Sequence, residues 1–583
     1  MWVFLRGVCF FRLGLQWCAV CGVVAHSLAA TWTWTGNGTN DNWSTPANWT
    51  PSGPPPTNDY RTTVILDGTQ RLAPQQDMAD LFQFGKLVFT NSAGSFVVGG
   101  TNYFSGCMGW RGFQFASSTA TLSVLGTNAI LLAGALRARD VSGNLATSTV
   151  FVADSGSLQA PWFNGKVGDR VVKNGPGLLR VYEHDENQYY LDAAVTDGSA
   201  PEWRINDGVV EAGSRTNRYA KNKSGTAWTN GAQVKIDGSV VVGDGIGAST
   251  SAVLRLIGEP TAVIGSGTSI TVCPDGLLDF ANVQGFGGED GSCVVITNDS
   301  GCIRMGTNAL VLRKGALLDL HGNARFEGAT SNSLTLYDGC TVHADATGTR
   351  AVLASDVRMA SASSMTGVVF QVDDKPGDDV DLQITGQFGF GGAGLIKRGA
   401  GTLAISNYFF TTRDNRIDEG ALQVNGVACG SGAAWLVTTN GTLGGCGVLS
   451  SAVVNVQSGT LNPGASGVAG VLTVESNVCF DAGSKLVMDV INGGALGLTH
   501  DQLTIQRGVL GGLTNIDMLV CVAGGWGRGA TTLRVIDGGG DYTGQRLHSC
   551  ALQGAPQCRA TPVYGNGFVD VRIFSPITVL VFE

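Results

Sequence analysis

Charge is scarce in this sequence. Asp, Glu, Lys and Arg together make up 14% of its 583 residues, well under the roughly 25% of ordinary soluble domains. Hydrophobic residues still account for 43%, so the composition is not that of a disordered chain, which is charged and poor in Val, Ile and Leu. The formal net charge of −9 argues against a nucleic-acid backbone as a partner.

Proline and helical periodicity are scarce as well. Only 16 residues are proline, and glycine follows no three-residue period, which excludes collagen. No amphipathic pattern continues for three helical turns, which excludes folds that need a helix after each strand, such as Rossmann domains and TIM barrels. After the first thirty residues, no apolar run is long enough to cross a bilayer as a helix. We therefore expect no membrane span in the mature chain.

The start of the chain has the pattern of an export signal. Arg6 and Arg12 precede an apolar stretch that ends near Val24, and small residues close the segment at Ala30. This order predicts a signal peptide over 1–30, with an uncleaved membrane anchor as the alternative. The mature protein is therefore expected to be secreted or at the cell surface.

Cysteines give little sign of a metal site. Three of the 14 lie in the leader, and the odd remainder leaves at least one thiol unpaired. No CxxC pair with zinc spacing occurs in the mature chain. Cys550 and Cys558 are the best candidates for a disulfide.

Glycine, by contrast, is abundant, with 85 residues, about twice the usual share. Short apolar or alternating runs such as Thr63–Leu66 and Val471–Val474 recur between clusters of Gly, Asn, Asp and Ser. Such runs predict strands joined by tight turns. Several β-sandwiches in series would need linkers between them, and 51–56 is the only Pro-rich stretch in the sequence. One long β-solenoid therefore fits better.

Internal similarity supports the solenoid. Residues 173–179 read KNGPGLL and residues 397–403 read KRGAGTL, a shared K-x-G-x-G-x-L pattern. Each copy is followed by a turn and a strand, at 206–210 and at 418–424. Repetition of this kind is typical of stacked coils.

The second copy lies in a stretch that resembles the autotransporter-associated β-strand repeat. GLIKRGAGTLAISN at 394–407 and EGAL at 419–422 match that family's approximate pattern, GLxKxGxGTLxLSGxN…GxLxV. Strong resemblance covers 381–505, and weaker resemblance covers 173–213. The motif positions are Lys397, Gly399, Gly401, Leu403, Gly420 and Leu422. Because these are structural positions, the resemblance implies fold and export and assigns no catalytic residue.

The resemblance implies an all-β fold, a right-handed parallel β-helix with an N-terminal capping segment. We expect a signal peptide (1–30), a Trp-rich cap (31–81), a solenoid with degenerate repeats (82–380), and a solenoid with the repeat and C-terminal strands (381–583). Stacking at ~4.8 Å per coil predicts a rod ~100 Å long. No translocator barrel is expected within the sequence. NYFFTTR at 407–413 replaces the usual corner of the repeat, which predicts a bulge in that coil.

Two groups of residues are candidates for binding. Five acidic residues surround a Lys-Pro-Gly turn and indicate a solvated loop, with calcium as the alternative ligand: Asp373, Asp374, Asp378, Asp379 and Asp381. Four tryptophans crowd the mature N-terminus, where they either cap the solenoid or stack on sugars: Trp32, Trp34, Trp43 and Trp49.

These patterns predict an exported, non-enzymatic β-solenoid at the cell surface or outside the cell. One version of this prediction is an adhesive protein whose partners are extracellular glycans or cell-surface components. The alternatives are a polysaccharide lyase or hydrolase and a carbohydrate-binding protein on the same scaffold. The mature histidines are scattered along the sequence and indicate no catalytic triad. No cofactor is expected apart from the calcium alternative.

Overall fold

The computed structural model describes residues 30–575 with gaps at 58, 60, 80, 101–111, 116, 118, 133–135, 138–146, 161–162, 165–168, 182–201, 214–219, 222–227, 230–234, 237–238, 259–261, 265–268, 284–285, 289–294, 306–309, 329–332, 349, 362–366, 431–432, 451, 466–467, 493–497, 525 and 527–528. The predicted signal peptide, except Ala30, lies outside these residues.

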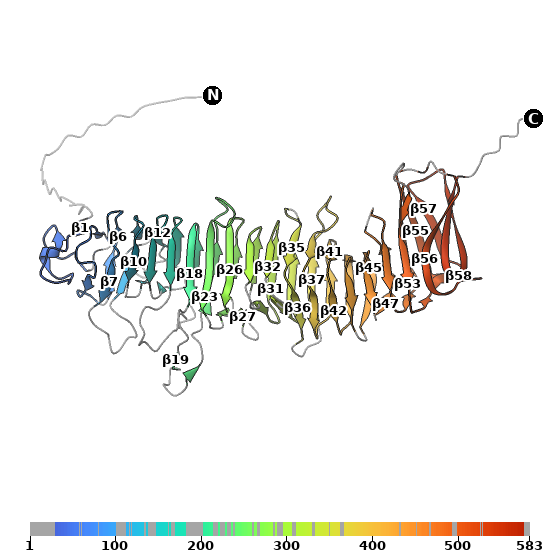
Figure 1. The fold of residues 1–583 in the computed structure, drawn as a ribbon, viewed down its shortest axis with the longest axis horizontal. Coiled ribbons are helices and arrows are strands. Elements are labelled where there is room, and N and C mark those ends of the chain that lie inside the picture. Colours follow the sequence, from blue (N-terminus) through green and yellow to red (C-terminus); the bar gives the residue numbers. More distant parts are fainter. Residues whose placement is uncertain are drawn as a thin grey trace, which may run out of the picture.

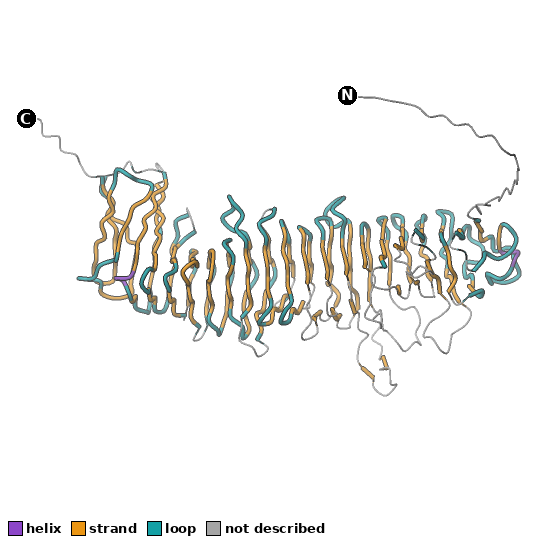
Figure 2. The backbone as a smooth tube through the Cα atoms, turned by 180° about the vertical axis from the view of Figure 1, so that it is seen from behind, coloured by secondary structure: helices purple, strands orange, loops and turns teal. Residues whose placement is uncertain are grey.

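The chain forms an elongated stack of short strands, from β1 at the blue end to β58 at the red end (Figure 1). Almost every strand pairs in parallel with a strand of the next coil, and most coils contribute one strand to each of three sheets. Loops gather at the corners between the sheets (Figure 2). Within the described residues, the helical elements are the 3-10 turns η1 (Pro46–Asn48) and η3 (Leu513–Asn515), and neither could span a membrane.

Sheet 1 runs the length of the stack and contains β1 (Thr31–Trp34), β3 (Thr63–Leu66), β6 (Lys86–Phe89), β9 (Thr121–Val124), β12 (Thr147–Val152), β15 (Arg170–Asn174), β17 (Glu202–Ile205), β22 (Ser239–Val242), β25 (Ser269–Val272), β28 (Val295–Asp299), β31 (Leu317–His321), β34 (Thr341–Ala344), β37 (Val368–Val372), β40 (Leu395–Arg398), β43 (Asn415–Val424), β45 (Ala434–Gly445), β47 (Val453–Val456), β50 (Val478–Phe480) and β54 (Leu510–Gly511).

Sheet 2 lies beside it and contains β4 (Gln75–Gln76), β7 (Val97–Gly100), β10 (Ala129–Leu132), β13 (Ser157–Ala160), β16 (Leu178–Val181), β18 (Gly208–Gly213), β23 (Ala252–Gly258), β26 (Gly276–Val283), β29 (Cys302–Met305), β32 (Arg325–Gly328), β35 (Ala351–Ala354), β38 (Leu382–Ile384), β41 (Thr402–Ile405), the second halves of β43 and β45, β48 (Thr460–Pro463), β51 (Ser484–Asn492), β55 (Ile516–Ala523) and β57 (Ser549–Gln553).

Sheet 3 is described in two parts, β5 (Leu81–Phe84), β8 (Gly112–Phe115), β11 (Leu136–Arg137) and β14 (Phe163–Asn164), then β21 (Lys235–Ile236), β24 (Ala262–Ile264), β27 (Phe286–Gly288), β30 (Leu310–Leu312), β33 (Leu334–Tyr337), β36 (Val357–Ala360), β39 (Phe388–Gly391), β42 (Phe409–Thr411), β44 (Val427–Cys429), β46 (Val448–Ser450), β49 (Val471–Val474), β53 (Gln502–Ile505), β56 (Thr531–Asp541) and β58 (Arg559–Phe574). The antiparallel pairings in the described chain are β1 with β2 (Trp49–Thr50), β51 with β52 (Leu498–His500), β56 with β58, and the hairpin β19 (Ala220–Lys221) and β20 (Trp228–Thr229).

Alternation along each strand fills the interior with apolar side chains. Leu403 on β41 pairs in register with Leu382 on β38 and Leu422 on β43. All three are fully buried, as is Val424, in agreement with the inward direction that the sequence pattern predicts. In-register stacking places inward-facing apolar side chains above one another, so the core contains apolar columns that run along the stack.

Two local expectations need correction. Cys550 and Cys558 are free thiols: Cys550 packs against the core, and Cys558 Sγ lies 3.3 Å from Ser575 Oγ. The irregular pairing expected at 407–413 does occur, but the register shift between β39 and β42 falls between Gly389 and Gly391, on the neighbouring strand.

Candidate functional site

The lysine of the repeat motif lies inside the solenoid. Lys397 on β40 faces inward and is fully buried. Its Nζ donates to the carbonyl oxygens of Arg398 at 2.9 Å, Gly399 at 2.6 Å and Glu419 at 3.1 Å. Burial lowers the pKa of Lys397 to about 8, although the charge of Glu419 opposes this shift. The motif therefore supplies a buried cation that holds the corners of two successive coils together.

The weaker copy of the motif has the same arrangement. Lys173 on β15 is buried, and its Nζ donates to the carbonyl oxygens of Asn174 at 3.2 Å, Gly175 at 2.6 Å and Asp207 at 3.0 Å. Burial lowers its pKa to about 8 as well. The similarity between 173–179 and 397–403 thus reflects one repeated corner.

The motif glycines permit close stacking at this corner. Gly399 and Gly420 have φ values of +76° and +66°, which side-chain-bearing residues rarely adopt. A Cβ on Gly420 would overlap the carbonyl oxygen of Gly399, and one on Gly401 would overlap that of Asp373. These residues, with Leu403 and Leu422, position backbone and core and present no reactive group to solvent.

Three of the four N-terminal tryptophans are buried. Trp34, Trp43 and Trp49 are 1%, 0% and 3% exposed, whereas Trp32 is partly buried. Their rings pack edge to face, with 5.1 Å between the centroids of Trp34 and Trp49 and 5.2 Å between those of Trp43 and Trp49. Because buried rings offer no face to a sugar, glycan stacking here could involve only Trp32.

Two carboxylates of the acidic loop are already bound by donors of the protein itself. The buried carboxylate of Asp381 accepts the backbone N–H groups of Lys375 at 3.0 Å and Thr402 at 2.7 Å. Asp378 lies 3.1 Å from Lys375 Nζ in an ion pair. These bonds are those of a turn stabilised by its own side chains.

The remaining carboxylates of this loop lie in different surroundings. Asp373 lies 3.2 Å from His343 Nε2, whereas Asp374 and Asp379 are exposed. Within the described ranges, no three His, Cys, Asp or Glu side chains are placed so that they could share a metal ion.

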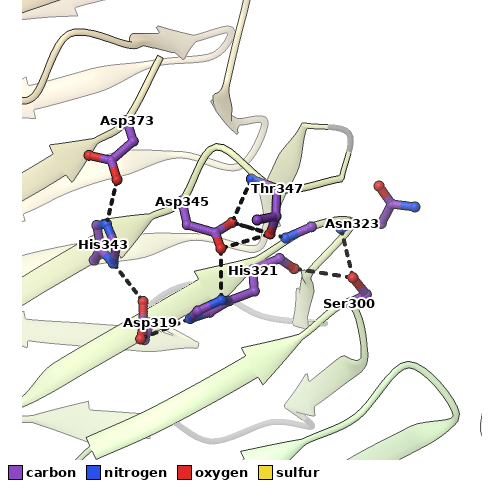
Figure 3. A network of polar contacts seen from close by, with 9 residues as sticks. Ser300, Asp319, His321, Asn323, His343, Asp345, Thr347 and Asp373 are labelled. Carbon is purple, nitrogen blue, oxygen red and sulfur yellow. Dashed lines mark hydrogen bonds and ion pairs between the residues drawn. The ribbon is translucent and has the colours of Figure 1, made fainter. Parts of the chain in front are cut away.

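A cluster that the sequence analysis did not identify faces outward from sheet 1 (Figure 3). His343 on β34 lies 2.7 Å (Nδ1) from Asp319 Oδ1 and 3.2 Å (Nε2) from Asp373 Oδ2. His321 on β31 lies 2.8 Å (Nδ1) from Asp345 Oδ2. Its Nε2 is 2.9 Å from Asp319 Oδ2, an ion pair without the alignment of a hydrogen bond. We call these five side chains the Asp–His ladder.

Parallel register creates the ladder. Asp319 is directly opposite His343 across the pairing of β31 with β34. Residues two apart in a strand share a face, so His321 lies beside Asp319. Asp345 is also held by the Thr347 hydroxyl at 2.7 Å and the Gly322 N–H at 3.3 Å. The sequence signals are DLH at 319–321 and HAD at 343–345, which become informative only once the coil length is known.

The ladder favours charged imidazoles. Burial opposes the charge, but the adjacent carboxylate of Asp319 and the charges of Asp345 and Asp299 raise the pKa of His321 above its ordinary value. Burial likewise opposes the charge of His343, and Asp373 and Asp319 together raise its pKa. An imidazolium donates from both nitrogens, which suits a ring between two carboxylates.

The raised pKa values predict a stability contribution that depends on pH. A histidine whose pKa is higher in the folded state stabilises that state fully below its unfolded value, and this stabilisation is lost as pH rises through the folded value. The double variant His321→Gln/His343→Gln should therefore be less stable than the wild type by about 1 kcal/mol at pH 5.5, since the side chains are 31% and 27% exposed.

Urea unfolding measured from pH 5.5 to pH 9 should show this difference shrinking as pH rises. His500→Gln, outside the ladder, is the control. A difference that is constant over the whole range would contradict the pKa assignment.

A second ladder on sheet 2 uses charges of both signs. Arg255 Nη1 lies 3.3 Å from Glu211 Oε1, and Arg255 Nε lies 3.1 Å from Asp279 Oδ2. Arg180 pairs with Glu211 at 3.0 Å. Opposite charges in register stabilise a sheet face, and like charges would destabilise it. The Arg–acid ladder comprises Arg180, Glu211, Arg255, Asp279, Arg304 and Glu327.

No protein-family model matches the sequence, and no curated protein matches it. One solved structure, the Haemophilus influenzae Hap adhesin, is similar over 88% of this chain and 64% of that chain, with 11% identity and a TM-score of 0.19. The chain thus spans less than two thirds of that structure's length, and a similarity this low identifies neither fold nor function. Membership of the β-strand repeat family stays a prediction.

Proposed function

We propose that the chain is an exported, non-enzymatic β-solenoid, a rod at or beyond the surface of a Gram-negative-type bacterium that attaches this surface to extracellular material. Export is supported by the signal-peptide pattern over 1–30. The rod is supported by parallel sheets that continue from the first coils to the last. Membership of the autotransporter-associated repeat family, the right-handed winding of the coils and the capping role of 31–81 are parts of the same proposal.

The main support is that outward ionisable side chains bind one another. Both oxygens of Asp319 face imidazole nitrogens, and both nitrogens of His343 face carboxylates. A general acid or base must reach the substrate with a lone pair or proton of its own. The Asp–His ladder leaves these groups engaged along the stack, which suits attachment of coil to coil.

A polysaccharide lyase or hydrolase is the competing function, because the ladder does gather carboxylates beside histidines. The test is turnover. Purified 31–583 is incubated with neutral and acidic polysaccharides, and reducing ends and unsaturated uronic products are followed. We expect no release above that of Asp319→Asn/His343→Gln, which supplies the background. Turnover by the wild type that this double variant loses would overturn the proposal.

A further inference from the structure

An exposed aromatic row interrupts sheet 3. Phe390 on β39 and Tyr408, immediately before β42, are each 37% exposed, and Phe410 on β42 is half-buried. The ring centroid of Phe390 lies 5.6 Å from that of Tyr408 and 6.1 Å from that of Phe410, with interplanar angles of 36° and 26°. Buried aromatics of the same coils supply the interior, as in the stacked pair Phe388 and Phe409, so this row is additional to the core.

The backbone is distorted in a way that turns Phe390 outward. Phe388 faces the core, so regular alternation would also bury Phe390, two residues later. The register shift between Gly389 and Gly391 breaks the alternation, and Phe390 takes a φ of +51°. A Cβ at Gly389 would overlap the carbonyl oxygen of Phe410, and one at Gly391 would overlap that of Met359. Bulges that redirect a side chain, and strained residues held by their surroundings, concentrate at functional sites.

An unpaired arginine adjoins the row. Arg358 on β36 is exposed and is in register with Gly389, which in turn is in register with Phe410. Arg358 has no ion-pair partner among the described residues, unlike the arginines of the Arg–acid ladder. It is also the only charged residue in five successive strands, β30, β33, β36, β39 and β42. These five strands therefore carry a single, positive charge beside the aromatic row, although the whole chain carries a formal charge of −9.

We propose that Arg358, Phe390, Tyr408 and Phe410 bind an acidic polysaccharide. The apolar C–H faces of sugar rings would pack on the exposed aromatic surface, and the Arg358 guanidinium would take a uronate carboxylate or a sulfate in a bidentate contact. Charge complementarity selects an anionic chain, because no carboxylate on these strands repels it. One aromatic-bearing coil follows another, so a polymer that lies along the stack meets the row at successive sugars. This inference rests on the proposed attachment function and names its ligand class.

The test exploits the strain at Phe390. Phe390→Gly removes the ring and relieves the positive φ, so the variant should melt at the same temperature as the wild type or higher. With polygalacturonate as the probe at low salt, we expect Phe390→Gly to bind roughly tenfold more weakly than the wild type. Arg358→Gln should weaken binding to a similar extent and reduce its salt dependence. Dextran, a neutral polymer, should bind the wild type much more weakly.

Two variants elsewhere on the surface serve as controls. Ile246→Ala removes an exposed apolar side chain (76% exposed), and Arg559→Gln removes an exposed arginine of β58. Both should bind polygalacturonate as the wild type does. Absence of binding by the wild type, or equal binding of dextran that Arg358→Gln leaves unchanged, would overturn the inference.

Self-association that Phe390→Gly abolishes, seen by light scattering, would assign the row to a second copy of this chain instead. Surface attachment of cells that persists with Phe390→Gly would refute this ligand site while leaving the attachment function intact.

Discussion

Leu403→Asp is expected to destabilise the solenoid by at least ~4 kcal/mol, because it removes a buried aliphatic side chain and places a carboxylate where it has no partner. Leu403 is fully buried and stacks between Leu382 and Leu422. The loss should appear as a lower melting temperature and as new protease cleavage within 381–445.

Ser406→Asp is the matched control for this variant. It introduces the same charge three residues later on the same coil, at an exposed position. We expect a change within about 0.5 kcal/mol. Unaltered protease resistance in Leu403→Asp would show that this residue does not face the core.

Lys397→Met is expected to destabilise the chain by about 3 kcal/mol. Methionine keeps most of the apolar stem but removes the ammonium that donates to the carbonyl oxygens of Arg398, Gly399 and Glu419. Three bonds to a charged donor contribute roughly 2 kcal/mol each. The opposing cost of burying the charge is on the order of 3 kcal/mol, from the lowering of the pKa from 10.5 to about 8. Urea unfolding at pH 7 measures the net loss, and Lys86→Met, at an exposed strand position, is the control.

The same lysine predicts a second, independent signature. Between pH 8 and pH 10.5 the unfolded lysine keeps a proton that the folded one has released, so the free energy of unfolding rises with pH across this window. Lys397→Met lacks the contribution of Lys397 to this rise, and its deficit relative to the wild type should therefore grow as pH increases. Lys173→Met should behave alike, because Lys173 has the same surroundings. A deficit independent of pH would contradict the burial of a titrating ammonium.

The sequence predicts the parts of this fold that repeat. Short alternating runs such as Thr63–Leu66 are strands in the structure, and the inward direction of Leu403 follows from alternation alone. The K-x-G-x-G-x-L pattern identifies matching corners because glycine with positive φ and a buried lysine are both required there. These are local features, fixed within a few residues of the chain.

The outward features depend on coil length and could not be predicted. Asp319 contacts His343 only because one coil of this particular length lies between them. Coil length varies along the stack, with 24 residues from Asp319 to His343 but 20 from Arg398 to Asp418. The exposure of Phe390 could not be predicted either, because alternation places its side chain inside and only the register shift between Gly389 and Gly391 turns it outward. The tryptophans were the easier case: the capping interpretation expects buried rings, and three of the four are buried.

Small-angle X-ray scattering of purified 31–583 measures whether one continuous stack of coils forms a rod in solution. For a rod we expect an asymmetric distance distribution with a tail that reaches ~100 Å, as coils stacked at ~4.8 Å require. A symmetric distribution with a radius of gyration near ~25 Å, the value for a compact globular chain of this length, would contradict it.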